Sequence, residues 1–218
     1  MSKKAFIFDL DGVIVDTAKY HFMAWQKLAD SLDILFTPEH NEELKGVSRV
    51  RSLEIILQLG NVTASEEEKQ KWLTQKNEDY LSYIEKMDES EILPAVRETL
   101  EFIKENGQHI ALGSASKNAR PILEKVGLLH FFDVIVDGND VTNAKPDPEV
   151  FVRASKLLGV SNENAIVFED SVAGIQAANI AGMLSIGIGE KNVLKEAKYC
   201  FPNFLHMDTS FIETLIKK

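Results

Sequence analysis

From residue 92 onward, short apolar runs alternate with amphipathic stretches that are long enough for helices, and a glycine follows each helical stretch. Strands separated by helix-length connections pair in parallel through crossovers, so the pattern predicts an α/β fold with a doubly wound parallel sheet. The apolar run at 5–8 has the same texture and is predicted to join that sheet. The later predicted strands are 109–112, 132–136, 165–168 and 184–188, and the predicted helices are 94–106, 117–126, 148–158 and 172–181.

The segment between residues 17 and 88 has helical periodicity and no convincing strand. Ser65 followed by three glutamates is typical of a capped helix start. We therefore predict a helical domain, residues 16–92, inserted after the first strand of a core formed by residues 1–15 and 93–218. The helices predicted in this domain are 17–32, 38–44, 50–59 and 65–87.

The motif Asp9-Leu10-Asp11-Gly12 follows the first predicted strand. Side chains two residues apart on a strand point to the same side, so Asp9 and Asp11 are expected to face one small volume. Two like charges that close are costly without a cation or a proton between them. The motif fits a metal site in which one carboxylate is a nucleophile and the other moves a proton. It fits equally well a strand that ends in a turn, because Asp and Gly are common turn residues.

Polar residues also follow the later strands of the predicted sheet. Each group alone has an ordinary interpretation as a loop or a helix start. Together with Asp9 and Asp11, however, these groups follow four successive predicted strands. Ligands bind at the carboxyl ends of the strands in an open parallel sheet. Carboxylates, hydroxyls and lysines together suit a magnesium ion and a phosphoryl group. These groups are Ser114-Ala115-Ser116-Lys117-Asn118, Lys145-Pro146-Asp147-Pro148 and Glu169-Asp170-Ser171.

Each of these residue types has a physical role in phosphoryl transfer. The carboxylate of Asp9 is suited to attack phosphorus, and Asp11 is suited to move a proton. Hydroxyls at Ser114 and Ser116 and free helix N–H groups are suited to hold phosphate oxygens, while Lys145 adds positive charge. Oxygen ligands for Mg²⁺ are expected from Asp9, Asp170, Glu169 and the main-chain carbonyl of Asp11.

Composition narrows the range of partners. The formal net charge is −10, so an acidic surface repels the phosphate backbone of nucleic acid, which is not expected as a partner. Cys200 is the single cysteine and is expected to be a packed residue. The N-terminal apolar run is too short and too acidic for a signal peptide, and no stretch has the composition of a membrane span. We therefore expect a cytoplasmic protein, and the absence of a coiled-coil pattern favours a monomer.

At these residues the chain resembles the haloacid dehalogenase-like phosphotransferases. The resemblance covers nearly the whole chain through Gly189, and the helical segment matches that superfamily's cap. It implies a Rossmann-like core with an inserted α-helical cap, Mg²⁺ as the cofactor and an aspartyl-phosphate intermediate. The matching motifs are Asp9-Leu10-Asp11-Gly12, Ser114, Lys145 and Glu169-Asp170. The implied catalytic residues are Asp9, Asp11, Ser114 and Lys145, and the implied metal-binding residues are Asp9, Asp11, Glu169 and Asp170.

The predicted cap carries two further features. Thr17, His21 and Trp25 are four residues apart and lie on one helical stripe that starts near Asp11. The stretch Leu44-Lys45-Gly46-Val47-Ser48-Arg49 combines a glycine, which lets backbone approach a ligand, with an arginine that can grip a phosphate. Both features also have an interpretation without a ligand. His21 can be a partly buried histidine with a structural role, and Arg49 can be a solvated residue at a helix end.

With Lys76-Asn77 and residues 114–118, these features are similar to the mutases of the superfamily that interconvert β-D-glucose 1-phosphate and D-glucose 6-phosphate. The resemblance implies that Arg49, Ser116 and Asn118 hold the phosphate that is not transferred, with the backbone of Gly46-Val47. It also implies that His21 and Lys76 help the cap to close on a sugar phosphate. The predicted substrate-binding residues are Thr17, His21, Trp25, Gly46, Val47, Arg49, Ser52, Lys76, Ala115, Ser116, Lys117 and Asn118.

Two other functions fit the same motifs. One is a magnesium-dependent sugar-phosphate phosphatase, and the other is a non-catalytic binding protein, which the intact acidic and lysine residues disfavour. Two positions depart from the mutase pattern, because Val50-Arg51 replaces acidic residues and Ala119-Arg120 replaces a Gly-Pro pair. Arg51 is expected to add a cation near the distal phosphate.

Overall fold

Six parallel strands form one sheet in the order β3-β2-β1-β4-β5-β6. The computed structural model describes residues 3–217, so residues 1–2 and 218 of the predicted core lie outside the described range. The chain builds the sheet outward from β1 in one direction and then returns beside β1 to build the other half, which confirms the predicted doubly wound α/β fold. The strands are β1 (Ala5–Phe8), β2 (His109–Gly113), β3 (Val134–Val136), β4 (Ala165–Glu169), β5 (Leu184–Ile188) and β6 (Tyr199–Phe201).

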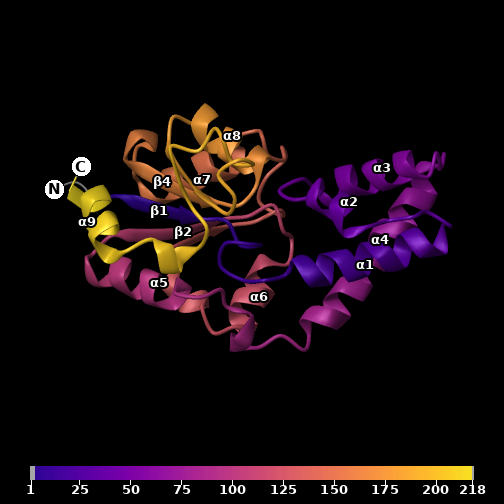
Figure 1. The fold of residues 1–218 in the computed structure, drawn as a ribbon, viewed down its shortest axis with the longest axis horizontal. Helices are drawn as coiled ribbons and strands as arrows, with labels where there is room; N and C mark the ends of the chain where they lie inside the picture. The colour runs from indigo at the N-terminus through magenta and orange to yellow at the C-terminus, as the bar shows by residue number, and fades with distance from the viewer. Residues whose placement is uncertain (1–2, 218) are drawn as a thin grey trace.

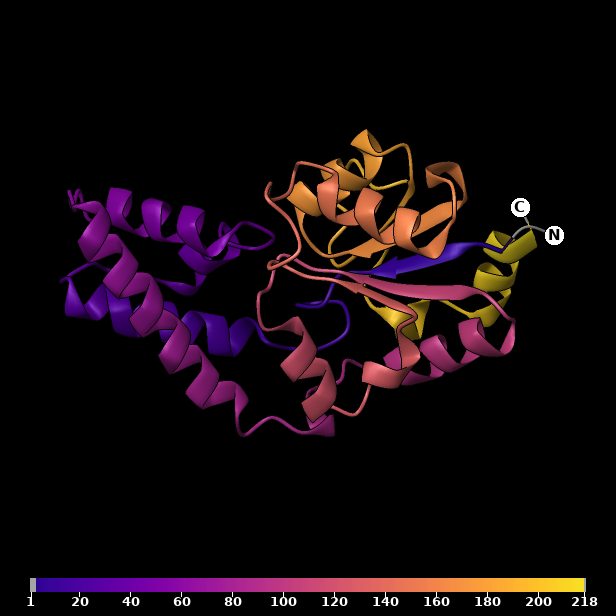
Figure 2. The same ribbon diagram turned by 180° about the vertical axis from the view of Figure 1, so that it is seen from behind.

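Both faces of the sheet are covered, because alternate residues of each strand point to opposite sides. Phe6 and Phe8 belong to the larger apolar cluster, and Ala5 and Ile7 belong to a second cluster on the other face. Helices α7 and α8 pack on the second cluster, and α5, α6 and α9 contribute to the first, an arrangement visible in both views (Figures 1 and 2). These helices are α5 (Val96–Glu105), α6 (Ala119–Lys125), α7 (Glu149–Leu158), α8 (Val172–Ile180) and α9 (Thr209–Lys217).

A group of helices forms a separate body beside the sheet, on the right of Figure 1. It has its own apolar core, which includes Trp25, Leu53 and Leu73, and it corresponds to the predicted helical domain. We call residues 16–92 the helical insertion; its division from the core at these residues remains a prediction. Its helices are α1 (Ala18–Ser31), α2 (Pro38–Glu42), α3 (Arg49–Leu59) and α4 (Glu66–Ile84).

The two chain segments that join the insertion to the core run side by side. Val15 bridges Asp11 in parallel and Ile92 in antiparallel. The N–H of Leu93 donates to the carbonyl of Ile14 at 3.0 Å, which ties the outgoing and returning segments together. The first of these segments starts directly after Asp11, so the insertion joins the core next to the end of β1.

The structure adds two elements that the sequence analysis does not predict and shifts the start of others. Strand β6 has three residues, too few for an alternating pattern to be recognised, and α9 lies in the tail beyond the motifs. Helix α6 begins at Ala119 rather than at 117, and β3 begins at Val134 rather than at 132. Among residues 3–217, no helix combines the length and the apolar character that crossing a membrane requires.

Candidate active site

Polar side chains from three separate segments meet at the carboxyl ends of the central strands. Asp9 follows β1, and Glu169 ends the adjacent β4. The Lys145 ammonium group donates to Asp9 Oδ1 at 2.5 Å and to Glu169 Oε2 at 2.7 Å. All three side chains are buried, and Ser114 is buried after the neighbouring strand β2. The structure therefore brings together the predicted nucleophile, the predicted lysine and one predicted metal ligand.

Burial controls the ionisation of this cluster. It opposes the charge on Lys145, but the carboxylates of Asp9 and Glu169 outweigh this effect and raise the pKa of Lys145. Burial raises the pKa of Asp9, and the charges of Glu169 and Asp11 act in the same direction, while Lys145 lowers it. An ionised Asp9 therefore depends on nearby positive charge, which Lys145 supplies in part.

Gly12 makes room for the next carboxylate. Its φ is +77°, a conformation that favours glycine, and a Cβ atom at this position would lie 2.1 Å from Asp170 Oδ2. The carboxylate of Asp170 thus packs directly over the Gly12 backbone. Burial raises the pKa of Asp170 well above its ordinary value, and the charges of Glu169 and Asp9 add to this effect.

Three carboxylates are close enough to hold one cation. Asp9, Glu169 and Asp170 each offer an oxygen, and these oxygens lie within 4.8 Å of one another. Glu169 is held in place because its Oε1 accepts hydrogen bonds from the Ser171 hydroxyl at 2.8 Å and the Ser171 N–H at 3.0 Å. Three hard oxygen donors, of which two share the single ammonium group of Lys145, suit Mg²⁺. The residues present therefore fit the predicted magnesium ion.

Asp11 is held by the helical insertion. The Thr17 hydroxyl donates a hydrogen bond to Asp11 Oδ1, and His21 Nε2 lies 3.8 Å from the same oxygen. Burial raises the pKa of Asp11, partly offset by the hydrogen bond from Thr17 and by the charges of Lys145 and Lys76. A carboxyl whose pKa is shifted toward neutrality is suited to move protons at physiological pH.

Lys76 lies in an aromatic cage inside the insertion. Its Nζ atom is 4.7 Å from the ring centroids of both Trp25 and Tyr80 and 3.1 Å from His21 Nδ1. Burial and the charge of Arg49 lower the pKa of Lys76 to about 7. Burial, Lys76 and Arg49 also lower the pKa of His21 well below its ordinary value, so the imidazole is neutral at pH 7. Trp25 is buried, and its ring faces the Lys76 ammonium group.

Arg49 adds positive charge near Lys76 and His21. Arg49 opens α3 and is half-buried, and within residues 3–217 no carboxylate pairs with its guanidinium group. The Tyr80 ring lies against His21 in a tilted arrangement with ring centroids 4.3 Å apart, and its buried hydroxyl has no hydrogen-bond partner among the described residues. An arginine and a lysine with so little negative charge around them favour an anionic ligand.

The loop after β2 links the core to the insertion. Ser114 Oγ accepts from the Ser116 N–H at 3.1 Å, and Ser116 Oγ accepts from the Asn118 N–H at 3.2 Å. These hydrogen bonds hold residues 114–118 in a loop that precedes α6. Because the two hydroxyl oxygens accept these bonds, the hydroxyl hydrogens of Ser114 and Ser116 can be donated to a ligand. The Asn118 side chain donates to Asn77 Oδ1 of α4 at 3.1 Å. Ala115 is half-buried, and Lys117 is exposed, with its carbonyl accepting from Asn139 at 3.0 Å.

The Gly46 loop lies closer to the core than we expected. Gly46 has a φ of +73°, and a Cβ atom there would lie 2.3 Å from Ser171 Oγ. The backbone of Gly46 thus approaches the core closely at Ser171, and its predicted contact with a ligand stays a prediction. Val47 packs against the core of the insertion, and the buried Ser52 hydroxyl donates to the Ser48 carbonyl at 3.1 Å.

The two residue pairs that depart from the mutase pattern form local contacts. Arg51 donates to Glu54 on its own helix at 2.9 Å, and its expected contribution of a cation near the distal phosphate stays a prediction. Arg120 donates to the Ile135 carbonyl at 2.9 Å and lies 3.6 Å from Asp137. Arg51 thus pairs with a carboxylate of the insertion, and Arg120 contacts a carbonyl and a carboxylate of the core.

Three residues of this region were missing from our predicted set: Lys45, Asn77 and Tyr80. Asn77 and Tyr80 lie on α4, one and four residues after Lys76, so the helical spacing from Lys76 was a usable signal for Tyr80. Lys45 Nζ lies 3.9 Å from Asp170 Oδ2, a contact between distant segments that spacing does not reveal.

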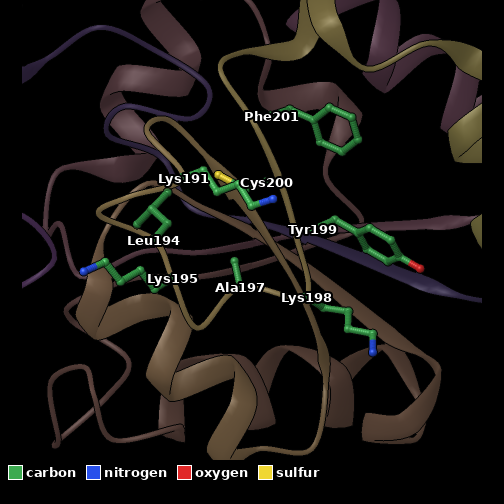
Figure 3. Close-up of a pocket in the computed structure, with 8 residues that line it drawn as sticks. All are labelled: Lys191, Leu194, Lys195, Ala197, Lys198, Tyr199, Cys200 and Phe201. Carbon is green, nitrogen blue, oxygen red and sulfur yellow. The ribbon is translucent and has the colours of Figure 1, made fainter.

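A separate hollow of about 340 Å³ lies beside β6 and contains none of the predicted site residues. Figure 3 shows that Lys195 and Lys198 point away from each other, so their charges do not converge on one ligand position. We assign no ligand to this hollow. It is lined by Lys191, Leu194, Lys195, Ala197, Lys198, Tyr199, Cys200 and Phe201.

Comparisons with known proteins agree with this geometry. The β-phosphoglucomutase of Bacillus subtilis (strain 168) is 42% identical over 189 residues, which cover 86% of this chain and 84% of that protein. The phosphorylated carbohydrates phosphatase of Thermotoga maritima is 34% identical over 182 residues, which cover 83% of this chain and 82% of that protein. The crystal structure of a β-phosphoglucomutase from Clostridium difficile superimposes with a TM-score of 0.94 at 42% identity, covering 99% of this chain and 98% of that one.

The family model for haloacid dehalogenase-like hydrolases matches residues 3–182, a range that contains the insertion and all four strand ends described above. With a match over most of the chain and relatives above 30% identity, the resemblance stated from the motifs is confirmed. The chain belongs to the haloacid dehalogenase-like hydrolase family.

Proposed function

We propose that this protein is a β-phosphoglucomutase, which interconverts β-D-glucose 1-phosphate and D-glucose 6-phosphate through β-glucose 1,6-bisphosphate. The observation that carries the proposal is that Thr17 and His21 of the insertion lie against Asp11 of the core. The helical insertion therefore both positions the Asp11 carboxyl and covers the site. This arrangement favours phosphoryl transfer to a bound sugar over phosphoryl transfer to water. The 42% identity to the Bacillus subtilis mutase supports the same function.

We propose that the helical insertion, residues 16–92, is a cap that closes over the core of residues 1–15 and 93–218. The paired segments at Val15 and Ile92 are the hinge. Asn77 with Asn118, and Gly46 with Ser171, are contacts of the closed form. Closure of such a lid excludes water and completes the set of groups around the substrate.

In the first half-reaction, the C6 hydroxyl of β-glucose 1-phosphate attacks the phosphorus carried by phosphorylated Asp9. A P–O bond to C6 oxygen forms, the P–O bond to the Asp9 carboxylate breaks, and Asp11 accepts the hydroxyl proton. The products are the 1,6-bisphosphate and an ionised Asp9. Lys145, 2.5 Å from Asp9 Oδ1, stabilises that carboxylate as it leaves.

In the second half-reaction, the bisphosphate is bound in the reverse orientation. The Asp9 carboxylate attacks the phosphorus at C1, the bond from phosphorus to the C1 oxygen breaks, and Asp11 returns its proton to that oxygen. Glucose 6-phosphate leaves and the phosphorylated enzyme is restored. The raised pKa of Asp11 allows the same group to act as base in one direction and as acid in the other.

A bisphosphate needs two phosphate sites. Ser114 and Lys145 hold the group that is transferred, next to Asp9. Arg49, Ser116 and Asn118, with the backbone of residues 46–47, hold the other phosphate. The support for the second site is that no carboxylate pairs with Arg49 in the described part of the chain and that the hydroxyl hydrogen of Ser116 is available.

We propose Mg²⁺ as the cofactor, which Asp9, Asp170, Glu169 and the main-chain carbonyl of Asp11 would hold and which would supply positive charge to the phosphoryl oxygens. Sugar phosphates are the substrates. We propose the cytoplasm as the location and a monomer as the working form.

The products of a single reaction test the proposal. Purified protein is incubated with β-glucose 1-phosphate, Mg²⁺ and a trace of the 1,6-bisphosphate, and the phosphorus-containing products are followed by ³¹P NMR. The mutase converts the substrate to glucose 6-phosphate with little inorganic phosphate. Release of inorganic phosphate without glucose 6-phosphate establishes the alternative, a sugar-phosphate phosphatase, which the similarity to the Thermotoga maritima phosphatase favours.

A further inference from the structure

The loop between α2 and α3 brings a positive charge to the acidic edge of the core. Lys45 Nζ lies 2.8 Å from Glu42 Oε2 in the insertion and 3.9 Å from Asp170 Oδ2 in the core. The Asp170 side chain is 11% exposed and that of Glu42 is 63% exposed, so the core carboxylate is the less solvated of the two. Lys45 thus has one carboxylate partner on each side of the boundary between the insertion and the core.

The residue next to Lys45 is fixed at the same place. Gly46 lies so close to Ser171 that a Cβ atom would be 2.3 Å from the Ser171 hydroxyl oxygen, and the Ala173 methyl group would be 3.8 Å away. Consecutive residues of the cap loop therefore meet consecutive residues of the core, Lys45 with Asp170 and Gly46 with Ser171. The backbone contact gives the Lys45 side chain a defined position, which a single exposed ion pair lacks.

Asp170 has a second role, because it belongs to the group of three carboxylates that fits a cation. A carboxylate oxygen that ligates a divalent ion is a poorer partner for an ammonium group, and two cations near one carboxylate repel each other. We propose that Lys45 is a positioning residue that latches the cap onto the core through Asp170 and competes with the metal ion for that carboxylate. The proposal rests on the role of Asp170 as a metal ligand in the proposed function. Glu42 is the partner that Lys45 retains when Asp170 binds the metal.

The variant Lys45→Met tests the competition. Methionine keeps a long unbranched side chain and removes the charge, so the packing of the loop is preserved. We expect Mg²⁺ to bind the variant more tightly, by roughly tenfold, as measured by isothermal titration calorimetry without any sugar phosphate. Damage to the loop would weaken Mg²⁺ binding or leave it unchanged, so the direction of the change separates the two explanations.

Two further variants are controls for the Mg²⁺-binding measurement. Lys69→Met removes a lysine that pairs with Glu66 on α4 of the same insertion, so it reports the effect of overall charge alone. Lys45→Arg keeps the charge and is expected to bind Mg²⁺ as the wild type does. Equal or weaker Mg²⁺ binding by Lys45→Met relative to Lys69→Met would overturn the proposal.

The latch also predicts a change in cap position. Spin labels at Glu67→Cys in α4 and Lys156→Cys in α7, both exposed, report the distance between cap and core in a Cys200→Ser background. Without Mg²⁺, Lys45→Met is expected to shift this distance to longer values than Lys69→Met does, and an unchanged distance contradicts the latch. If the wild type binds no Mg²⁺, both the proposed metal site and the competition at Asp170 are wrong. If the product assay shows a phosphatase instead of a mutase, the Mg²⁺ affinities and the spin-label distances still test the latch.

Discussion

Replacement of Lys76 by methionine tests the electrostatics of the buried cationic cluster. The Lys76 side chain is 2% exposed, and burial and the charge of Arg49 lower its pKa from 10.5 to about 7. In the unfolded chain the ordinary pKa is restored. Between pH 7 and pH 10.5 the unfolded chain therefore binds more protons than the folded protein, so the free energy of unfolding rises with pH across this window.

The pKa shift sets the size of the effect. A change from 10.5 to about 7 corresponds to about 5 kcal/mol at 1.36 kcal/mol per unit, and about 3 kcal/mol of that cost is present at pH 8. At pH 8 the Lys76 side chain is mostly neutral in the folded protein, so the attraction of a charged ammonium group to the rings of Trp25 and Tyr80 does not offset this cost. We therefore expect Lys76→Met to raise the free energy of unfolding by about 3 kcal/mol at pH 8 and to lose most of this advantage by pH 10.

Urea denaturation of both proteins at pH 8, 9 and 10 measures this difference. Burial lowers the pKa of His21 and raises that of Tyr80, and both residues are present in both proteins, so their titration does not produce the difference between wild type and variant. Lys27→Met is the control, since Lys27 is exposed, pairs with Asp79, and has a pKa that this hydrogen bond raises. An identical pH dependence for wild type and Lys76→Met would refute the argument.

Three further substitutions test the site. Asp9→Asn is expected to reduce turnover by at least about 10⁴-fold because it removes the nucleophile, and activity near that of the wild type would disprove the assignment. Gly46→Ala is expected to raise KM by about tenfold, because the new methyl group meets Ser171, whereas Gly159→Ala, which has the same left-handed backbone and open space around it, leaves KM unchanged. Arg49→Ala is expected to raise KM for the sugar phosphate by about 10–100-fold with a smaller effect on kcat, and an unchanged KM would exclude the phosphate contact.

The sheet was predictable because its strands are short, apolar and separated by helices of standard length. The same alternation located the strand ends that carry Asp9 and Glu169, and the structure shows that these strands, β1 and β4, are adjacent. Strand β6 was not predictable, because its three residues are recognised only by their pairing with β5. The start of α6 was misplaced because the hydroxyls of Ser114 and Ser116 bind backbone N–H groups and hold the preceding residues in a loop.

The site was predictable where its residues follow strands or share a helical stripe that starts near Asp11, and less so where single residues of the insertion and the core meet. Thr17 and His21 were identified from their spacing, and the structure places both beside Asp11. The contact between Asn77 and Asn118 joins residues 41 positions apart in the chain, and neither residue alone indicates the other. Gly46 was interpreted as a ligand contact because its backbone is permissive, but only the fold shows that Ser171 is its neighbour.

The fate of the phosphoryl group on Asp9 shows whether the enzyme transfers that group to a sugar phosphate or to water. Enzyme carrying a ³²P-labelled phosphoryl group is mixed in a single turnover with β-glucose 1-phosphate and Mg²⁺, and the labelled products are separated over time. The proposed mutase transfers the label to a hexose bisphosphate faster than water removes it. Release of all the label as inorganic phosphate, at a rate that the sugar phosphate does not change, would contradict the account.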